Sequence, residues 1–348
     1  MTSNSANASS QNKKNGLMFW TLTKRHLKMI FSDKIRMFYT LMVPVIILLV
    51  YILFLRDMEL NAIENELLKL GMDTTNKALL KHITTIVDAW MLSGIISISV
   101  MTISLQTNSL LVEDKEKGIN KDFASSPIKK TSLIASYFVY NFIITVALTL
   151  MVVVASIIFL AAYGEMYLTI VDVLTIIGIV LFSTVPTTLI TVFICIFIKT
   201  EPVLASVIAA VSAAIGFLTG AYMPITMLAL PIQYLCGFIP GTYTCALTRF
   251  AYLSGPISSF EAYLVANPSI LPSGVTVDTV TDLVNSNFGF NVNFFGLSVT
   301  PSWDVLVIGI FLVIFLVLNI FFSGKLARVE EKPIKILKKR LKKIANKK

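Results

Sequence analysis

One stretch without a charged side chain decides the fold of this chain: PVLASVIAAVSAAIGFLTGAYMPITMLALPIQYLCGFIPGTYTCALT, residues 202–248. A helix that crosses the hydrocarbon core of a bilayer needs about 20 apolar residues, so this stretch is too long for one straight span. We predict a span over residues 203–222, followed by an outer re-entrant hairpin from residue 223 to about residue 253 that other parts of the protein must cover. The helix breakers that divide the stretch are Gly220, Pro224, Pro231, Gly237, Pro240 and Gly241.

Five further charge-free runs of suitable length lie on either side of this stretch. The composition agrees with a surface that faces lipid, because 55% of the residues are hydrophobic and 14% are charged, whereas a soluble globule has about a quarter of its residues charged. The chain is therefore predicted to be an all-α membrane protein whose residues 37–324 form one six-span domain. The other spans are expected at about 37–55, 89–112, 133–161, 173–198 and 304–324.

The distribution of basic residues orients these six spans. If both termini are cytoplasmic, the number of crossings is even, so the hairpin cannot be a seventh span. This arrangement places 24 of the 29 Lys and Arg residues on the cytoplasmic side, as the positive-inside rule requires. We predict a multi-pass protein with both termini in the cytoplasm. The basic residues left outside are Arg56, Lys69, Lys77, Lys81 and Arg249.

The N-terminal segment divides into two parts. Residues 1–16 are polar and are expected to form a disordered cytoplasmic tail. Residues 17–36 predict an interfacial amphipathic helix, because Trp20, Leu27 and Phe31 share one helical face and the basic residues of the segment lie off it. A cytosolic extension of the first span is the alternative.

The remaining polar and cysteine-containing segments indicate no additional domain. Residues 325–348 form a basic cytoplasmic tail suited to an anionic lipid surface, so the net charge of +9 needs no nucleic-acid partner. Residues 56–88 have apolar side chains at helical spacing and predict a short external helix, and residues 255–302 predict a small external cap with some strand content. The cysteines Cys195, Cys236 and Cys245 are expected to be buried and inert, with a Cys236–Cys245 bridge as the alternative.

Isolated charges at the predicted outer boundary are expected to be solvated or to reach the headgroups, rather than to form an ion relay. No predicted span carries a charge pair near the bilayer midplane, which argues against a proton- or sodium-driven carrier. The boundary residues are Asp88, Glu165, Asp172 and Arg249.

The sequence contains no catalytic or nucleotide-binding signature. A Gly-x-x-x-x-Gly-Lys-Ser/Thr loop is absent, and the two histidines, His26 and His82, make histidine-based catalysis or a metal site improbable. We therefore expect no cofactor in this chain. If ATP drives transport, ATP and Mg²⁺ are bound by a separate ATPase subunit.

The cytoplasmic loop at residues 113–132 carries the most informative motif. Gly118 is expected to end the second span, Ile119 and Phe123 form an apolar i, i+4 pair, and Pro127 stops the helix that follows. Such a short helix across the membrane face can be pushed as a rigid unit. The motif residues are Asp114, Lys115, Glu116, Lys117, Gly118, Ile119, Phe123, Ser126 and Pro127.

This loop resembles that of the type-2 permeases of ATP-binding-cassette exporters, which include drug, O-antigen and teichoic-acid exporters of bacterial cell membranes. Their loop reads acidic-basic-Glu-x-Gly, with Ser-Pro eight and nine residues after the glycine, where this chain has Ser126 and Pro127. The resemblance implies that the loop is a coupling helix that docks on a separate ATPase subunit, present in two copies per transporter. Asn120 departs from the family pattern, because an apolar residue is usual there.

A second match lies in the outer hairpin. The spacing Gly220-x-x-x-Pro224, then Pro231, Pro240-x-Thr242-Tyr243 and Arg249, follows the pattern of the same family. The last outer loop is longer than in simple members, which leaves the external architecture and the substrate open.

Small residues in the fifth span predict a close helix contact. Ser212, Gly216 and Gly220 repeat every four residues, and such residues allow helices to approach closely in lipid. Packing within the chain is one interpretation. The resemblance implies another, in which the first and fifth spans of two permease copies or paralogues face each other, with Pro44 and the Gly216 region near the axis.

These features predict a permease subunit that exports an amphipathic, peptide or lipid-like substrate and is not itself an enzyme. A membrane-bound sensor is one alternative. The other is an enzyme acting on lipid-linked substrates, although Asp278, Asp282 and Asp304 of the late loop form no recognisable acid–base constellation.

Overall fold

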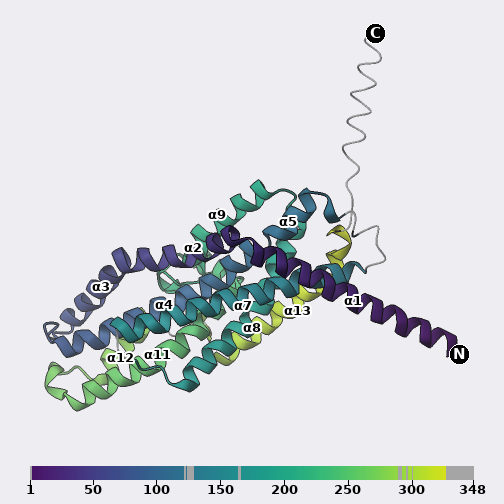
Figure 1. The fold of residues 1–348 in the computed structure, drawn as a ribbon. Coiled ribbons are helices and arrows are strands. Elements are labelled where there is room, and N and C mark those ends of the chain that lie inside the picture. The colour runs from purple at the N-terminus through teal and green to yellow at the C-terminus, as the bar shows by residue number, and fades with distance from the viewer. Residues whose placement is uncertain are drawn as a thin grey trace, which may run out of the picture.

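The computed structural model describes residues 2–120, 123, 129–163, 166–288, 292–294, 297–299 and 301–326. In these residues the chain forms a helical bundle, and six of its helices are long and apolar enough to cross a membrane. Figure 1 shows them running side by side along the bundle. The prediction of six apolar spans is confirmed. Their bounds are Lys34–Lys69, Lys77–Glu116, Lys130–Tyr163, Ile170–Phe197, Glu201–Leu218 and Pro301–Lys325.

The first span is longer than its apolar run. It consists of α2 (Lys34–Val50), the π-helix η1 (Tyr51–Leu55) and α3 (Arg56–Lys69), which follow one another without a break. The helix expected in residues 56–88 therefore exists, but it continues the first span. A π-helical turn adds a residue to the helical repeat and occurs frequently at functional sites.

The second span begins at Lys77, twelve residues before the predicted start at residue 89. It consists of α4 (Lys77–Thr107) and α5 (Ser109–Glu116), and the side chain of Asn76 caps the first turn of α4. Our expectation of a solvated Asp88 was wrong. The Asp88 carboxylate is fully buried, lies 2.8 Å from Arg56 Nε, and accepts a 2.6 Å hydrogen bond from Tyr51. Because this charge is paired inside the bundle, it does not end the helix.

Helix α4 is the central element of the bundle. It is buried along its length and packs against α2, α11, α7 (Lys130–Tyr163) and α8 (Ile170–Phe197). Helix α13 (Pro301–Leu326) packs on α8, α11 and α7, whereas α9 (Glu201–Leu218) is mostly exposed at the periphery. A capping box of Thr169 and Asp172 begins α8.

The segment after α9 turns back beside α4. It contains η2 (Ile225–Met227), α10 (Leu230–Gly237) and the long helix α11 (Pro240–Ala266). Near the start of α11, Ser97 donates a 2.7 Å hydrogen bond to the Gly241 carbonyl, and Thr248 lies within 3.2 Å of the Ser93 carbonyl. Tyr263, near the end of α11, lies 3.5 Å from Asn76 at the start of α4. Helix α11 therefore begins deep in the bundle and runs antiparallel to α4, so that its last turns lie beside the first turn of α4.

The end of the bundle that carries α3 holds the small cap. It comprises η3 (Pro268–Ile270), α12 (Val277–Asn287) and the strands β1 (Val292–Phe294) and β2 (Leu297–Val299). The strands pair antiparallel, with Val292 opposite Val299. The predicted strand content is thus confirmed, although most of the described cap is helical.

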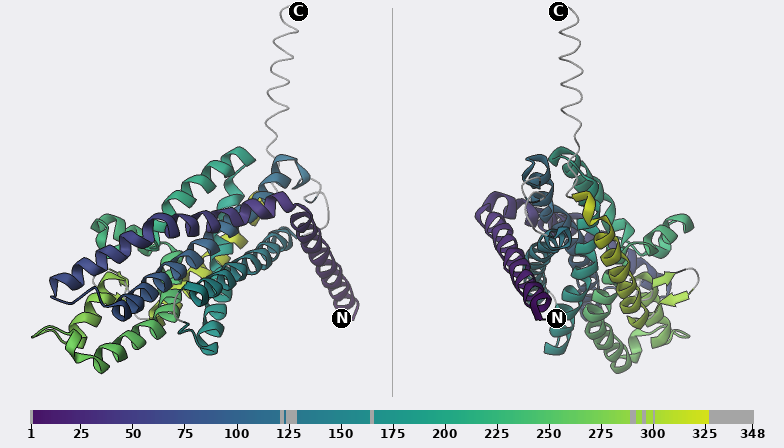
Figure 2. Two further views of the ribbon diagram at one scale, coloured as in Figure 1. Left: turned by 60° about the vertical axis from the view of Figure 1, so that its left-hand side comes forward. Right: turned by 90° about the vertical axis from the view of Figure 1, so that its right-hand side faces the viewer.

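Helix α1 (Thr2–Ser32) lies at the opposite end, near α5 and the end of α13 (Figure 1), and is inclined to the spans (Figure 2). Residues 2–16 belong to this helix, which differs from our expectation of a disordered tail. The segment contains no proline, so a helix anchored by residues 17–32 can continue through it. Trp20 and Phe31 are exposed, whereas Leu22, His26 and Ile30 are buried. The two faces of the helix therefore differ in their surroundings.

All three cysteines are buried and free, as the first of the two interpretations predicted. Glu165, Ser126, Pro127 and residues 327–348 of the basic tail lie outside the described residues.

Candidate functional site

Consecutive side chains of α5 hold different helices of the bundle. Glu113 Oε2 accepts a 2.7 Å hydrogen bond from Arg36 Nη2 of α2. The next residue, Asp114, forms a bidentate ion pair with Arg25 of α1, with N–O distances of 2.8 and 2.9 Å. Bidentate guanidinium–carboxylate pairs fix orientation as well as distance. Helix α5 is therefore joined to α1 and α2 by adjacent carboxylates.

The next two residues of α5 extend these connections to α8 and α9. Lys115 Nζ donates to the carbonyls of the last turn of α8 and the residue after it, at 3.0 Å from Cys195 and 2.8 Å from Ile196, and also to Ile198. A cation at this position satisfies carbonyls that the helix leaves unpaired and opposes the helix dipole. Glu116 Oε2 accepts a 2.8 Å hydrogen bond from the backbone N–H of Glu201 at the start of α9.

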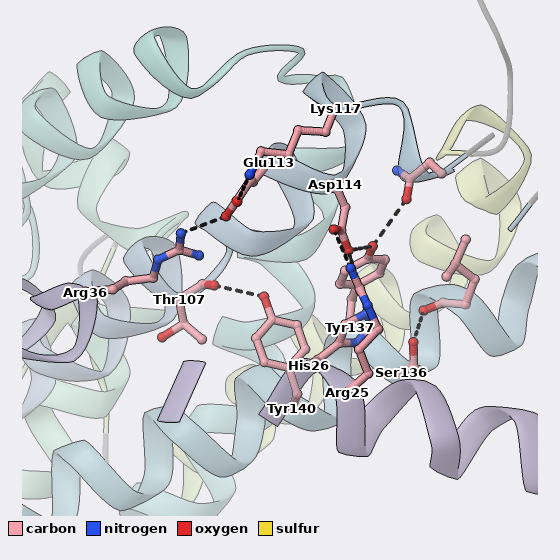
Figure 3. A network of polar contacts seen from close by, with 12 residues as sticks. Arg25, His26, Arg36, Thr107, Glu113, Asp114, Lys117, Ser136, Tyr137 and Tyr140 are labelled. Carbon is pink, nitrogen blue, oxygen red and sulfur yellow. Dashed lines mark hydrogen bonds and ion pairs between the residues drawn. The ribbon is translucent and has the colours of Figure 1, made fainter. Parts of the chain in front are cut away.

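The Asp114 carboxylate is the centre of this network and is fully buried. Besides its pair with Arg25, it accepts a 2.7 Å hydrogen bond from the Tyr137 hydroxyl of α7, and that hydroxyl lies 3.2 Å from Asn120 Oδ1. Figure 3 shows Arg25 and Tyr137 converging on Asp114. The hydrogen bonds from Arg25 to Asp114 raise the pKa of the Arg25 guanidinium above its ordinary value. A buried carboxylate is stable only with such partners.

His26 of α1 packs inside the same network. Its ring stacks on Tyr137 with the centroids 4.4 Å apart, and burial lowers its pKa to about 4. The imidazole is therefore neutral at pH 7. Tyr140 lies next to it and donates a 2.8 Å hydrogen bond to the Thr107 carbonyl, where α4 ends. Aromatic side chains thus fill the space between α1, α7 and the break in the second span.

Gly118 ends α5, as predicted. Its φ of +76° is a left-handed conformation that glycine adopts without strain, and its N–H donates to the Lys115 carbonyl at 3.1 Å. Ile119, Asn120 and Phe123 are helical again, and the Arg25 guanidinium lies 5.5 Å from the centre of the Phe123 ring. The same arginine therefore contacts both sides of the Gly118 turn.

This site consists of ion pairs, hydrogen bonds and packed rings that join several helices. The sequence analysis identified the α5 side of the network but missed Arg25, Arg36 and Tyr137. The available signal was weak: Arg25 lies off the apolar stripe of its helix, and Arg36 borders the first span. Their partners are 89 and 77 residues away in the sequence, a relation that no local pattern reveals.

The structure also brings the hairpin motif together. Thr242 Oγ1 donates to the Cys236 carbonyl at 2.7 Å, and the Tyr243 hydroxyl donates to the Gly237 carbonyl at 2.8 Å. Arg249 donates to the Gly220 carbonyl. Each side chain satisfies a backbone carbonyl at a helix end or turn, which an apolar environment requires.

Arg249 was expected at the outer boundary in a solvated position, and this was wrong. Its side chain is buried, and the guanidinium lies 4.6 Å from the centre of the Trp90 ring. The three prolines of the motif lie at element starts: Pro224 precedes η2, Pro231 is in the first turn of α10, and Pro240 begins α11.

Two glycines at and just after the end of α9, Gly216 and Gly220, are constrained within the chain. A Cβ atom at Gly216 would lie 2.1 Å from the Tyr222 ring, and Gly220 has a φ of +71°. Pro44 is buried in α2, and Ser212 is partly buried. For Gly216 the structure thus favours packing within the chain. The exposed face of α9 carries other small residues, Ala205, Ala209 and Ala213.

A cavity of about 690 Å³ separates the first span from the end of α9 and η2. Residues of α2, η1 and α3 line one side, and residues between Phe217 and Met227 line the other. Its walls are mainly apolar, and Glu59 is the one charged residue among its described lining residues. The volume is in the range typical of ligand-binding pockets.

Comparison with known proteins agrees with this arrangement. A family model described as ABC-2 type transporter matches residues 18–253, from α1 through the first half of α11. The match includes the α5 network, the hairpin motif and the cavity. No curated protein matches the chain.

Proposed function

The chain belongs to the ABC-2 type transporter family and is a permease subunit of an ABC transporter; from this premise we propose that it is an exporter powered by a separate ATPase. In this proposal two ATPase subunits bind ATP and Mg²⁺. The permease lies in the bacterial cell membrane with both termini in the cytoplasm. Helix α1 lies in the membrane interface, and the segment from η2 to α11 is a re-entrant hairpin.

The observation that carries this proposal is the attachment of residues 113–116 to five helices. Their side chains hold α1, α2, α7, the end of α8 and the start of α9. The helical segment with Ile119 and Phe123 follows directly after Gly118 and is our coupling helix. A push from a docked ATPase on this segment displaces α5, and the buried ion pairs carry that displacement to the other helices.

The cavity between the first span and α9 supports an amphipathic, peptide or lipid-like substrate, because its walls offer mainly apolar surface. We propose that α2 and α9 face a second permease copy or a paralogue across the route. Both helices expose a broad apolar surface in the single chain, including Val45, Leu49, Val203 and Phe217. An apolar surface also suits contact with membrane lipid, so the association of copies needs its own test.

Two measurements test the export proposal. Affinity purification of the tagged permease from native membranes should recover an ATPase subunit. The purified complex in vesicles should hydrolyse ATP, and its transport should be abolished when Ile119 and Phe123 are both replaced by serine. Recovery of the permease without an ATPase, or full transport by this variant, would contradict the proposal.

Orientation can be tested in intact cells with a membrane-impermeant maleimide. Native thiols give little background, because all three cysteines are buried. Lys117→Cys, beside the coupling segment, should stay unlabelled until the cells are opened, whereas Asp73→Cys, at the other end of the bundle, should be labelled at once. The reverse pattern would overturn the topology and with it the proposed ATPase contact.

A further inference from the structure

The Glu59 carboxylate borders the apolar cavity. It lies on α3, one helical turn beyond η1, and it makes no hydrogen bond or ion pair with any residue that the structure describes. Other acids on this helix differ. Glu66 pairs with Lys69 at 2.6 Å, and Asp57 points to solvent and does not line the cavity.

The surroundings of Glu59 disfavour an unpaired anion. Met58, Ala62 and Val50 line the same cavity, and Glu59 itself is only partly exposed. A charge beside apolar walls loses part of its hydration, so a cation that enters the cavity gains an attraction stronger than it would have in water. The carboxylate therefore selects for positive charge in a ligand whose body is apolar.

Two aromatic rings add to this preference. Phe217 and Tyr222 line the cavity from the side of α9, and their rings lie edge to face with centroids 5.2 Å apart. Ring faces attract cations, particularly those that carry no strongly bound water. The cavity thus combines one carboxylate, two rings and apolar walls.

Arg249 does not occupy the position of that cation. It is close enough to act on Glu59 electrostatically, but the two side chains do not approach within the 4.0 Å of an ion pair. Its Nη2 donates to the Gly220 carbonyl and its guanidinium lies over the Trp90 ring, whereas its buried Nε has no hydrogen-bond partner among the described residues. Glu59 therefore remains available to a ligand.

We propose that this cavity binds a cationic amphiphile, a molecule with an apolar body and one positively charged group that pairs with Glu59. The inference rests on the proposed export function, since it names the substrate class of the same route. It also applies to the permease alone, because all the residues that carry it belong to one chain.

Binding of radiolabelled tetraphenylphosphonium to the full chain in phosphatidylcholine nanodiscs tests the proposal, with empty nanodiscs subtracted. Triphenylphosphine oxide is the neutral comparison, since it has similar rings and no charge. We expect Glu59→Gln to weaken binding of the cation roughly tenfold or more, because the variant loses a charge–charge attraction in a partly desolvated site, and to leave binding of the oxide unchanged. Asp57→Asn, on the same helix but outside the cavity, should bind both probes as the natural chain does.

A second variant separates loss of the charge from loss of the cavity. Ala62→Phe fills the cavity and keeps Glu59, so it should weaken both probes, and an unchanged melting temperature shows that the variant is folded. Equal affinity of Glu59→Gln and the natural chain for the cation would overturn the proposal, and so would an equal loss for the oxide. If no ATPase is recovered but Glu59→Gln weakens binding of the cation, the export proposal is contradicted and the cation site is supported. If ATP-driven transport occurs but Glu59→Gln binds the cation as the natural chain does, the export proposal is supported and the cation site is contradicted.

Discussion

Arg25 of α1 and Asp114 of α5 form a two-point ion pair, with Nη1 2.8 Å from Oδ2 and Nη2 2.9 Å from Oδ1. The pair attaches the first helix of the chain to the end of the second span. Arg25 also lies over Phe123, beyond the Gly118 turn. One side chain therefore links α1, α5 and the proposed coupling segment, so movement of that segment relative to α5 must disturb α1.

Asp114→Asn should lower the stability of the permease and uncouple transport from ATP hydrolysis. The amide retains the shape but leaves Arg25 without a counter-charge, and because the Arg25 side chain is 30% exposed we expect about 2 kcal/mol rather than the 3–5 of a fully buried pair. The melting temperature in detergent measures the change. Lys24→Gln, an exposed neighbour of Arg25, is the control. An Asp114→Asn melting temperature equal to that of the control would show that the pair contributes nothing.

Gly118→Ala should impair coupling at a small cost in stability. An alanine in the left-handed conformation costs about 1 kcal/mol, so the turn between α5 and the coupling segment shifts. Gly178→Ala is the matched control, because Gly178 lies within α8 and a Cβ there meets nothing within 4 Å. The ratio of transport to ATP hydrolysis should fall for Gly118→Ala alone. Equal ratios in both variants would argue against a role for this turn.

Stability should depend on pH through His26. Its pKa is lowered to about 4 in the folded chain, against about 6.5 when unfolded, so the unfolded state binds the proton first as the pH falls. The stability that neutral His26 contributes is fully present above pH 6.5 and is lost as the pH falls toward 4. By pH 5 the loss in the free energy of unfolding is about 2 kcal/mol. Between pH 7 and 5, the melting temperature of His26→Phe should fall less than that of the natural chain. An equal fall in both proteins would contradict this prediction.

Tyr243→Phe should destabilise the hairpin without altering its packing. The change removes the hydrogen bond to the Gly237 carbonyl and leaves that buried acceptor unsatisfied, which costs about 1–3 kcal/mol. Tyr163→Phe removes a hydroxyl from an exposed ring and should have no effect. The two melting temperatures decide the matter, and a hairpin that tolerates Tyr243→Phe as well as Tyr163→Phe would not need this hydrogen bond.

Ala209→Trp should separate the proposed permease copies. Ala209 lies on the exposed face of α9, where a large ring would hold a second copy away while leaving the fold of one chain intact. Ala161→Trp, on an exposed face of α7, is the control. Light scattering of the purified proteins should give half the protein mass for Ala209→Trp alone. An unchanged mass would place the contact elsewhere.

Some features follow from local composition. The apolar runs predict the six spans because the cost of placing charge in hydrocarbon depends on each segment alone. The breaks at Gly118, Pro224 and Pro240 are also local, since the backbone of glycine and proline decides them. For these features the sequence was sufficient.

Other features required the packed bundle. Helix α4 can begin at Lys77 because the Asp88 charge is paired with Arg56. A glycine is needed at position 216 because the Tyr222 ring leaves no room for a Cβ atom. The Arg25–Asp114 pair and the cavity beside Glu59 likewise join residues from separate helices. The apolar runs of the sequence by itself determined which segments cross the membrane, because burial in lipid is a property of each segment. Only the tertiary structure decided which charges are paired and that Glu59 borders the apolar cavity, because those energies depend on distances between residues far apart in the chain.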